Sequence, residues 1–163
     1  MSVAELSIGP EDPRWAEPAA LVAALDAYCA SLYAEEENHL LSLDDLAAPD
    51  VIFLVVREAG RAVGCGAVRL DPSGYGEIKR MMVAPQARGR GIGRMILAEL
   101  ERRAIALGMD RLLLETGIRQ PEALALYESA GFGAIGPFGG YSENGVSVFM
   151  EKKLSALTAE MEK

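Results

Sequence analysis

The chain has 163 residues, of which half are hydrophobic and a quarter are charged, and its formal net charge is −8. This length is typical of a single domain that can bury a full core. The sequence contains no apolar run of roughly 18 residues or more, and no basic start followed by an apolar stretch, so we expect neither a membrane span nor a secretory signal.

The cysteine and histidine content argues against metal and hydrolase sites. Cys29 and Cys65 lack metal-ligand spacing, so a reduced, cytoplasmic protein is the simplest interpretation. His39 is the single histidine, which makes a histidine metal site or a Ser-His-Asp centre improbable, and we expect no metal. His39 follows a run of three glutamates, and we expect it at a helix end, near the rim of a substrate cleft.

The first half of the chain alternates strand and helix patterns. The predicted elements are a strand at residues 3–8, a helix at 17–33, a short helix at 43–47 and strands at 51–57 and 61–70. We expect the proline-containing segment 10–13 to end the first strand. Ser42 is a plausible N-cap for the short helix, and Ala59-Gly60 forms the turn between the two later strands.

The second half continues this mixed pattern. The predicted elements are a strand at 76–83, a helix from 92 to 107, a strand at 111–116, a helix at 121–130 and paired strands at 132–138 and 146–152. Residues 1–153 are predicted to form one domain, and residues 154–163 a frayed tail. The apolar residues 146–150 are expected at a sheet edge, where they could join two chains in a homodimer.

Basic residues concentrate in one part of an otherwise acidic chain. Residues 77–103 carry seven basic and three acidic side chains, whereas residues 1–76 carry four and thirteen. A basic island of this kind suits one anionic cofactor and argues against nucleic acid as a partner. The acidic remainder fits either a cationic amine substrate or a solubilising surface.

The segment from Val83 to Arg94 has the pattern of a phosphate-binding loop. It joins a predicted strand to a predicted helix and contains three glycines, which let the backbone approach an anion closely. The N–H groups of the first helical turn lack partners, and the helix dipole favours negative charge there. Three nearby arginines add guanidinium donors suited to phosphate. The alternative is a glycine-rich turn with solvated arginines.

Spacing separates the known kinds of phosphate loop. A Walker loop requires Lys-Ser or Lys-Thr after its last glycine, but Arg94 follows Gly93 here. A dinucleotide loop requires G-x-G-x-x-G, whereas this one is G-x-G-x-G; Glu115, 22 residues after Gly93, is the only support for that interpretation. The third possibility is the pattern Q-A-R-G-R-G at residues 86–91.

A second motif lies at residues 120–132, Q-P-E-A-L-A-L-Y-E-S-A-G-F. It predicts a short helix that ends at Gly131 and leads into a strand. With Q-A-R-G-R-G upstream, the chain resembles the GNAT superfamily of acetyl-CoA-dependent N-acetyltransferases, over about residues 51–153. The resemblance implies an α/β (α+β) fold with a mixed, mostly antiparallel sheet of about six or seven strands, flanked by about four helices. Splayed strands would form the acetyl-CoA cleft.

The resemblance also implies cofactor contacts along the strand, the loop and the second motif. Gln120 replaces the asparagine usual in the family, which lengthens the reach of its amide and puts that contact in doubt. The residues implied are Met81, Met82, Val83, Arg88, Gly89, Arg90, Gly91, Ile92, Gly93, Arg94, Gln120, Ala123 and Tyr127.

Two residues are the candidates for acid–base catalysis. An ammonium group must lose a proton before it attacks a thioester, and Glu77 lies where the resemblance places a catalytic carboxylate. The backbone N–H groups of Met82 and Val83 would stabilise the oxyanion. Tyr127 matches the tyrosine that protonates the departing thiolate. The alternatives are a solvated strand glutamate and an ordinary half-buried tyrosine.

The sequence therefore predicts transfer of an acetyl group from acetyl-CoA to a primary amine of a small molecule, by direct attack in a ternary complex. Protein lysines or N-termini are alternative acceptors. A catalytically inactive acyl-CoA-binding module is the alternative from another class, and a nucleotide-binding oxidoreductase is the third.

Overall fold

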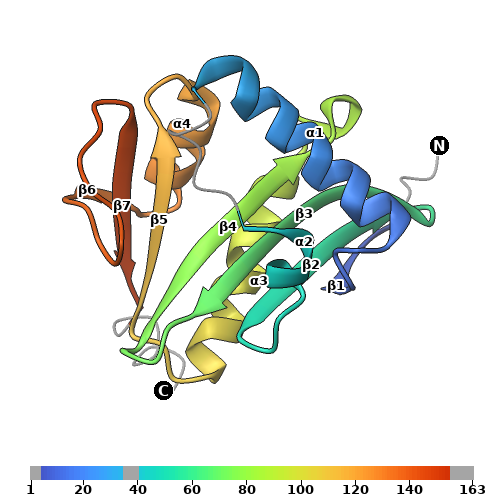
Figure 1. The fold of residues 1–163 in the computed structure, drawn as a ribbon. Coiled ribbons are helices and arrows are strands. Elements are labelled where there is room, and N and C mark those ends of the chain that lie inside the picture. The colour runs from blue at the N-terminus through green and yellow to red at the C-terminus, as the bar shows by residue number, and fades with distance from the viewer. Residues whose placement is uncertain (1–4, 35–40, 155–163) are drawn as a thin grey trace.

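The computed structural model describes residues 5–34 and 41–154, which form a sheet with helices on both faces (Figure 1). The strands are β1 (Leu6–Pro10), β2 (Val51–Glu58), β3 (Arg61–Leu70), β4 (Tyr75–Val83), β5 (Arg111–Gly117), β6 (Gly133–Ile135) and β7 (Ser147–Lys153). The α-helices are α1 (Ala16–Leu32), α2 (Leu43–Leu46), α3 (Ile92–Ala106) and α4 (Pro121–Ser129). None of these helices is long and apolar enough to cross a membrane.

The sheet confirms the predicted fold class. Its seven strands follow the order β1-β2-β3-β4-β5-β7-β6, and every neighbouring pair is antiparallel except β4 and β5. The predicted turn at Ala59-Gly60 is present, with both residues at positive φ. Ser42 caps α2, since its side chain accepts a hydrogen bond from the Asp45 backbone N–H.

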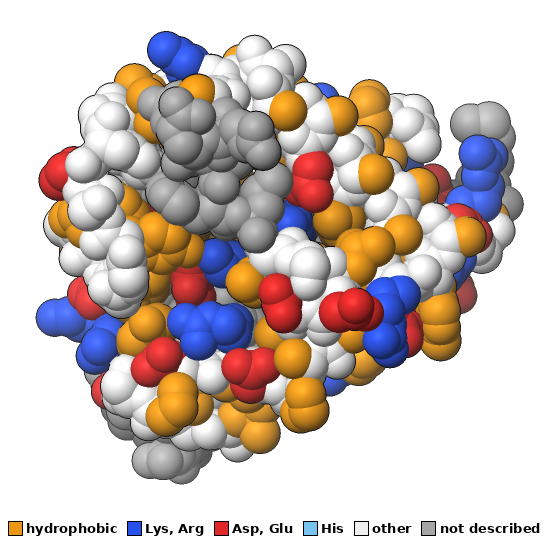
Figure 2. All heavy atoms as spheres, viewed as in Figure 1, with side chains coloured by type: hydrophobic (Ala, Val, Ile, Leu, Met, Phe, Trp, Pro, Cys, Tyr) orange, Lys and Arg blue, Asp and Glu red, His pale blue; other side chains and the backbone are white. Residues whose placement is uncertain are grey.

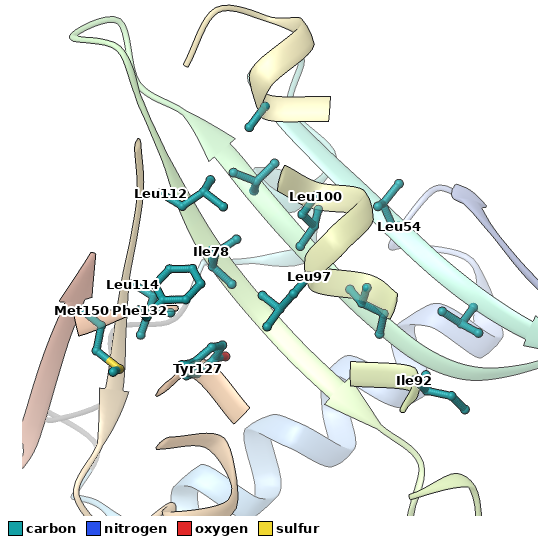
Figure 3. Close-up of a cluster of buried hydrophobic side chains, with 14 of the residues drawn as sticks. Leu54, Ile78, Ile92, Leu97, Leu100, Leu112, Leu114, Tyr127, Phe132 and Met150 are labelled. Atoms are coloured by element: carbon teal, nitrogen blue, oxygen red, sulfur yellow. The ribbon is translucent and has the colours of Figure 1, made fainter. Parts of the chain in front are cut away.

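Two hydrophobic clusters hold the helices to the sheet. In β2, Leu54 and Val56 face α3, whereas Phe53 and Val55 face α1, as the two-residue period of a strand requires. The larger cluster joins the sheet to α3 and α4, and Figure 3 shows its side chains converging between these layers. Full burial of each such side chain contributes about 1.5–3 kcal/mol.

The two ends of the described chain extend the predictions. Pro10 is the last residue of β1 and pairs with Leu54, so the strand ends within segment 10–13, as predicted, but two residues later than residue 8. Proline is compatible with this position because β1 is an edge strand, where a missing N–H leaves no partner unsatisfied. Leu154, assigned to the tail, is fully buried in the larger cluster, and its N–H donates to the Asp110 carbonyl at 2.9 Å.

The strand predicted for dimer formation is only partly at an edge. β7 pairs with β5 along its whole length, whereas β6 pairs with it only at Phe149–Glu151, so Phe149 and Met150 of the predicted surface already have a neighbouring strand on both sides. Its partner β6 is shorter than predicted and covers only Gly133–Ile135. A homodimer itself stays a prediction.

Candidate functional site

The site begins where β4 and β5 separate. These parallel strands pair only through Tyr75–Glu77 and Arg111–Leu113, and beyond this point they diverge into a wedge (Figure 1). A bulge in β4 accompanies the divergence, because Arg80 and Met81 together stand opposite Gly66 of β3. Bulges bend a strand and redirect its side chains. The splayed strands predicted from the family resemblance are therefore present.

Arg80 holds the bulge in place. Its φ of 52° is in the left-handed region, which costs a residue with a side chain about 1–2 kcal/mol. Its buried guanidinium lies with Nε 2.9 Å from Oδ1 of Asp26 in α1, and Nη2 donates to the Leu41 carbonyl. These contacts fix the bent strand against α1.

The loop after β4 has the geometry expected of an anion site. A single 3₁₀ turn at Pro85–Ala87 is followed by Gly89 and Gly91, whose φ values of 78° and 79° favour glycine. Gly91 is the N-cap of α3 and has no side chain to occupy the first-turn N–H groups. These donors, at the positive end of a 15-residue helix, are open to a phosphate.

The three arginines of this segment have different surroundings. Nε of Arg88 donates to the Val83 carbonyl at 3.0 Å, which sets the guanidinium beside the loop. Arg94 Nη1 donates to the Ser129 carbonyl and hydroxyl at 3.2 and 2.8 Å, joining the start of α3 to the end of α4. Arg90 pairs instead with Glu58 of β2. Arg88 is thus the cation with the most freedom to bind an anion.

A groove of about 650 Å³ runs from this loop into the wedge. All the residues implied as cofactor contacts line it except Arg90. The groove also brings the two sequence motifs together: a Cβ atom built on Gly93 would lie 3.1 Å from the Leu126 side chain, so a larger residue at this position would require Leu126 to shift by a few tenths of an ångström. Its further lining residues are Leu25, Tyr28, Ala87, Glu122 and Leu126.

Gln120 receives a partner that the sequence did not reveal. The hydroxyl of Tyr33, at the end of α1, donates to Gln120 Oε1 at 3.3 Å and accepts from the Arg119 N–H at 3.1 Å. The Tyr33 ring lies over Gly117, where a Cβ atom would be only 1.6 Å from the hydroxyl oxygen. Tyr33 therefore holds the amide oxygen of Gln120, a residue that lines both the groove and the smaller cavity described below.

Tyr127 stands where the groove meets a second, smaller cavity of about 130 Å³. Its ring packs edge-on against Phe132, with centroids 5.8 Å apart, at the border of the core shown in Figure 3. Burial raises the pKa of Tyr127 well above the usual value for a phenol. Its hydroxyl thus stays protonated and can serve as a hydrogen-bond donor.

Glu77 lines the smaller cavity and is only 3% exposed, which excludes the solvated-face alternative. Its Oε2 lies 2.8 Å from Lys79 Nζ and accepts from the Tyr141 hydroxyl at 2.5 Å, while Oε1 accepts from Arg69 Nη2 at 3.3 Å. Burial, followed by the bond to this carboxylate, raises the pKa of Tyr141.

Several residues of the smaller cavity were not predicted. Lys79 and Glu115 lie on its two strand walls, Cys29 comes from α1, and Tyr33 directly follows that helix. Tyr141 reaches Glu77 across 64 residues, so no local pattern announces it. Period-2 alternation from the buried Leu113 would have placed Glu115 on the same face of β5. His39 lies outside the described residues.

The visible face of the molecule carries charges of both signs. Figure 2 shows acidic and basic side chains next to one another, without an extended field of one sign. On this face, side chains of opposite charge from different chain segments lie close to one another (Figure 2). Arg57 with Glu11 and Arg90 with Glu58 are examples of such pairs.

Comparison with known proteins gives concordant matches. The model of the acetyltransferase (GNAT) family matches residues 19–132. An IAA acetyltransferase of Azospirillum brasilense is 49% identical over 150 residues, which cover 91% of this chain and 98% of that protein. A solved structure from Klebsiella pneumoniae, assigned as an acyl-CoA N-acyltransferase, has a TM-score of 0.79 and 41% identity, with 91% and 97% of the chains covered.

A more distant structure shares the fold alone. A protein of Bacillus anthracis, assigned as a streptothricin acetyltransferase and solved with acetyl coenzyme A, has a TM-score of 0.61 and 21% identity, covering 71% of this chain and 69% of its own. The family match spans more than half of the chain and includes both motifs and the wedge between them. The chain belongs to the GNAT family of acetyltransferases and is an acyltransferase enzyme.

Proposed function

We propose that this enzyme transfers the acetyl group of acetyl-CoA to a primary amine of a small molecule, by direct attack in a ternary complex. The observation that carries the proposal is the meeting of two cavities at Tyr127. A long groove leads there from an anion-binding loop, and a small cavity leads there from Glu77. Two substrates entering from these two sides would meet within the wedge.

The groove suits a substrate with a pyrophosphate at one end. The first-turn N–H groups of α3 and the Arg88 guanidinium would bind the pyrophosphate. The chain of the cofactor would then follow β4 past Met82, where the strand has no partner on its β5 side within the described residues. The acetyl-CoA bound in the Bacillus anthracis protein, which has the same fold, supports this choice of donor.

Glu77 and Tyr127 would move the two protons of the reaction. The ammonium gives one proton to Glu77, directly or through water, and the amine nitrogen then forms a bond to the acetyl carbon. The N–H groups of Met82 and Val83 would hold the resulting oxyanion. As the C–S bond breaks, its electron pair goes to sulfur, and the thiolate receives a proton from the Tyr127 hydroxyl. The nitrogen gives up its second proton, which restores the tyrosine hydroxyl directly or through water, so that a neutral amide and free CoA thiol result.

The size of the smaller cavity favours a small acceptor over a protein. A volume of about 130 Å³ admits only a few heavy atoms beyond the reacting amine. A lysine side chain or an N-terminus would have to enter with the rest of its protein outside. The test is a competition between free amines and peptides that carry the same amine.

The experiment measures release of free CoA thiol with a panel of primary amines, and mass spectrometry identifies the acetylated product. Arg88→Glu serves as the variant that cannot hold acetyl-CoA. Thiol release without an acetylated amine, or equal acetylation of peptides, would contradict the proposal.

Initial-rate kinetics test direct transfer. A ternary complex predicts intersecting double-reciprocal plots, whereas an acyl-enzyme predicts parallel ones. Cys29 is the nucleophile of the smaller cavity that could carry an acyl group, but burial raises the pKa of its thiol and keeps it protonated. We therefore expect Cys29→Ser to retain activity, and loss of activity with parallel plots would refute direct transfer.

A further inference from the structure

The smaller cavity contains information on the acceptor that goes beyond its size. Among the residues that the structure describes, two basic and two acidic side chains line it: Lys79, Arg80, Glu77 and Glu115. A site for a simple cation needs only negative charge. The described lining also offers positive charge, although the chain as a whole has a net charge of −8.

The sheet register places opposite charges on opposite walls. Glu77 pairs with Leu113 in the last paired position of β4 and β5. Two residues further along, Lys79 on β4 corresponds to Glu115 on β5, and both line the cavity between the diverging strands. Side chains two residues apart share a face of a strand, so Lys79 and Glu115 border the same space from its two sides.

The Lys79 ammonium is held in position. It lies 2.8 Å from Glu77 Oε2, donates to the Tyr141 hydroxyl at 2.6 Å, and its side chain is only 10% exposed. An ammonium has three N–H donors, so these two contacts leave one donor direction for a ligand. Arg80, by contrast, is committed to Asp26 and the Leu41 carbonyl. Lys79 is thus the cation that can meet a carboxylate.

The Glu115 carboxylate is oriented in a similar way. Its Oε2 accepts from the Ser147 hydroxyl of β7 at 2.6 Å. Glu115 has further contacts as well, and a carboxylate with about four acceptor positions can hold an ammonium ligand beside them. Glu115 and Lys79 therefore present opposite charges to a molecule between them.

We propose that the acceptor is a free amino acid, whose carboxylate binds Lys79 and whose ammonium binds Glu115. This inference rests on the proposed function, because it names the substrate of the same site. Glu115 holds the ammonium until Glu77 receives its proton, and Lys79 fixes the carboxylate so that the nitrogen faces the thioester. The side chain of the amino acid extends away from these two contacts.

The first experiment compares matched acceptors. Amino acids are screened for acetylation, and the best is compared with its amide and with the amine that lacks the carboxylate. Both comparison compounds keep the amine and lose the negative charge. We expect kcat/KM for the amino acid to exceed both by roughly 10- to 100-fold, the effect of one charge-assisted hydrogen bond. Equal values for the three compounds would overturn the proposal.

Substitutions of Lys79 on β4 and of Glu115 on β5 test which side of the cavity produces the preference for the amino acid over its amide. Lys79→Met keeps the aliphatic stem, and we expect it to bring the ratio of amino acid to amide close to one, while Lys79→Arg retains part of it. Because Lys79 also contacts Glu77, the ratio is the readout and not the absolute rate. Glu115→Gln should weaken all primary amines alike. Lys152→Met, which removes a lysine paired with Glu101 outside the cavity, is the control and should keep the wild-type ratio. A preference that survives in Lys79→Met would refute the assignment.

A binding measurement separates this inference from the proposed function. Calorimetry on the CoA-saturated protein measures the amino acid and its amide, without any turnover. If no amine is acetylated, the proposed function fails, yet tighter binding of the amino acid that is lost in Lys79→Met would still support the site. Equal binding of both ligands would exclude it.

Discussion

Replacing Glu77 by glutamine tests the proposed base, but the structure shows that it also disturbs a buried charge cluster. The carboxylate is the shared partner of Lys79, Arg69 and the Tyr141 hydroxyl. Glutamine keeps the size of the side chain but leaves the nearly buried Lys79 ammonium without its negative partner. Removing one member of a buried ion pair costs about 3–5 kcal/mol, and the partial exposure of Arg69 favours the lower end.

Glu77→Gln is therefore expected to change two quantities. The free energy of unfolding should fall by about 3 kcal/mol, which corresponds to a Tm about 6–12 °C lower for a domain of this size. Turnover should fall by about 10²–10⁴-fold if the carboxylate accepts the proton, and the acidic limb of the pH–rate profile should disappear. Acetyl-CoA should still bind, because Glu77 does not line the long groove.

The double variant Glu77→Gln/Lys79→Met separates the two effects. It removes both charges of the pair, so we expect much of the lost stability to return. Removing Lys79 does not supply a new base in place of Glu77. Turnover of an amine that lacks a carboxylate should therefore stay low in the double variant. Thermal unfolding and thiol release measure the two quantities. If turnover recovered together with stability, Glu77 would be the charge partner of Lys79, and Glu115, the other carboxylate of the cavity, would become the candidate base.

Three further predictions concern the cofactor side. Arg88→Glu places a carboxylate against the pyrophosphate and should abolish acetyl-CoA binding measured by calorimetry, since each lost charge-assisted bond costs about 1.5–3 kcal/mol; near-normal affinity would exclude the loop. Tyr33→Phe removes the contact with Gln120, and should raise KM for acetyl-CoA by about 3- to 10-fold. The control Tyr75→Phe, in a buried tyrosine outside the groove, should leave KM unchanged. Because burial raises the pKa of Tyr127, its proton is retained through about pH 10; kcat of the wild type and of Tyr127→Phe should vary in parallel between about pH 8 and 10, and an alkaline limb present only in the wild type would contradict this.

Local patterns were sufficient for most of the fold. The strand of residues 61–70 and the helix start at Ile92 agree with the structure, because period-2 and 3.6-residue hydrophobic repeats report directly on burial. The errors lie where sheet topology decides. Pro10 can be the last residue of a paired strand because β1 is at an edge, and Phe149 and Met150 have strands on both sides only because β6 returns to pair with them. Neither fact is encoded within a short window.

The residues of the candidate site also fall into two groups, those that local sequence patterns predict and those that only distant contacts bring into place. The loop residues around Gly91 could be predicted, since backbone requirements for positive φ and free N–H groups are local. The cluster around Glu77 could not, because Tyr141 arrives from the segment between β6 and β7. Arg90 shows the opposite case: it belongs to the motif by position, yet Glu58 of β2 draws its side chain away from the groove.

Gln120 shows why a motif has to be interpreted together with its distant contacts. The glutamine is longer than the asparagine usual in the family, and taken alone it would carry its amide to a different place. Tyr33 occupies the space over Gly117 and bonds to the glutamine oxygen, which restricts the extra length. The same tyrosine directly follows α1, whose Cys29 lines the smaller cavity. If the acceptor binds in this cavity and Gln120 contacts the cofactor, as proposed, a shift of α1 on acceptor binding would reach the Gln120 amide through the Tyr33 hydrogen bond.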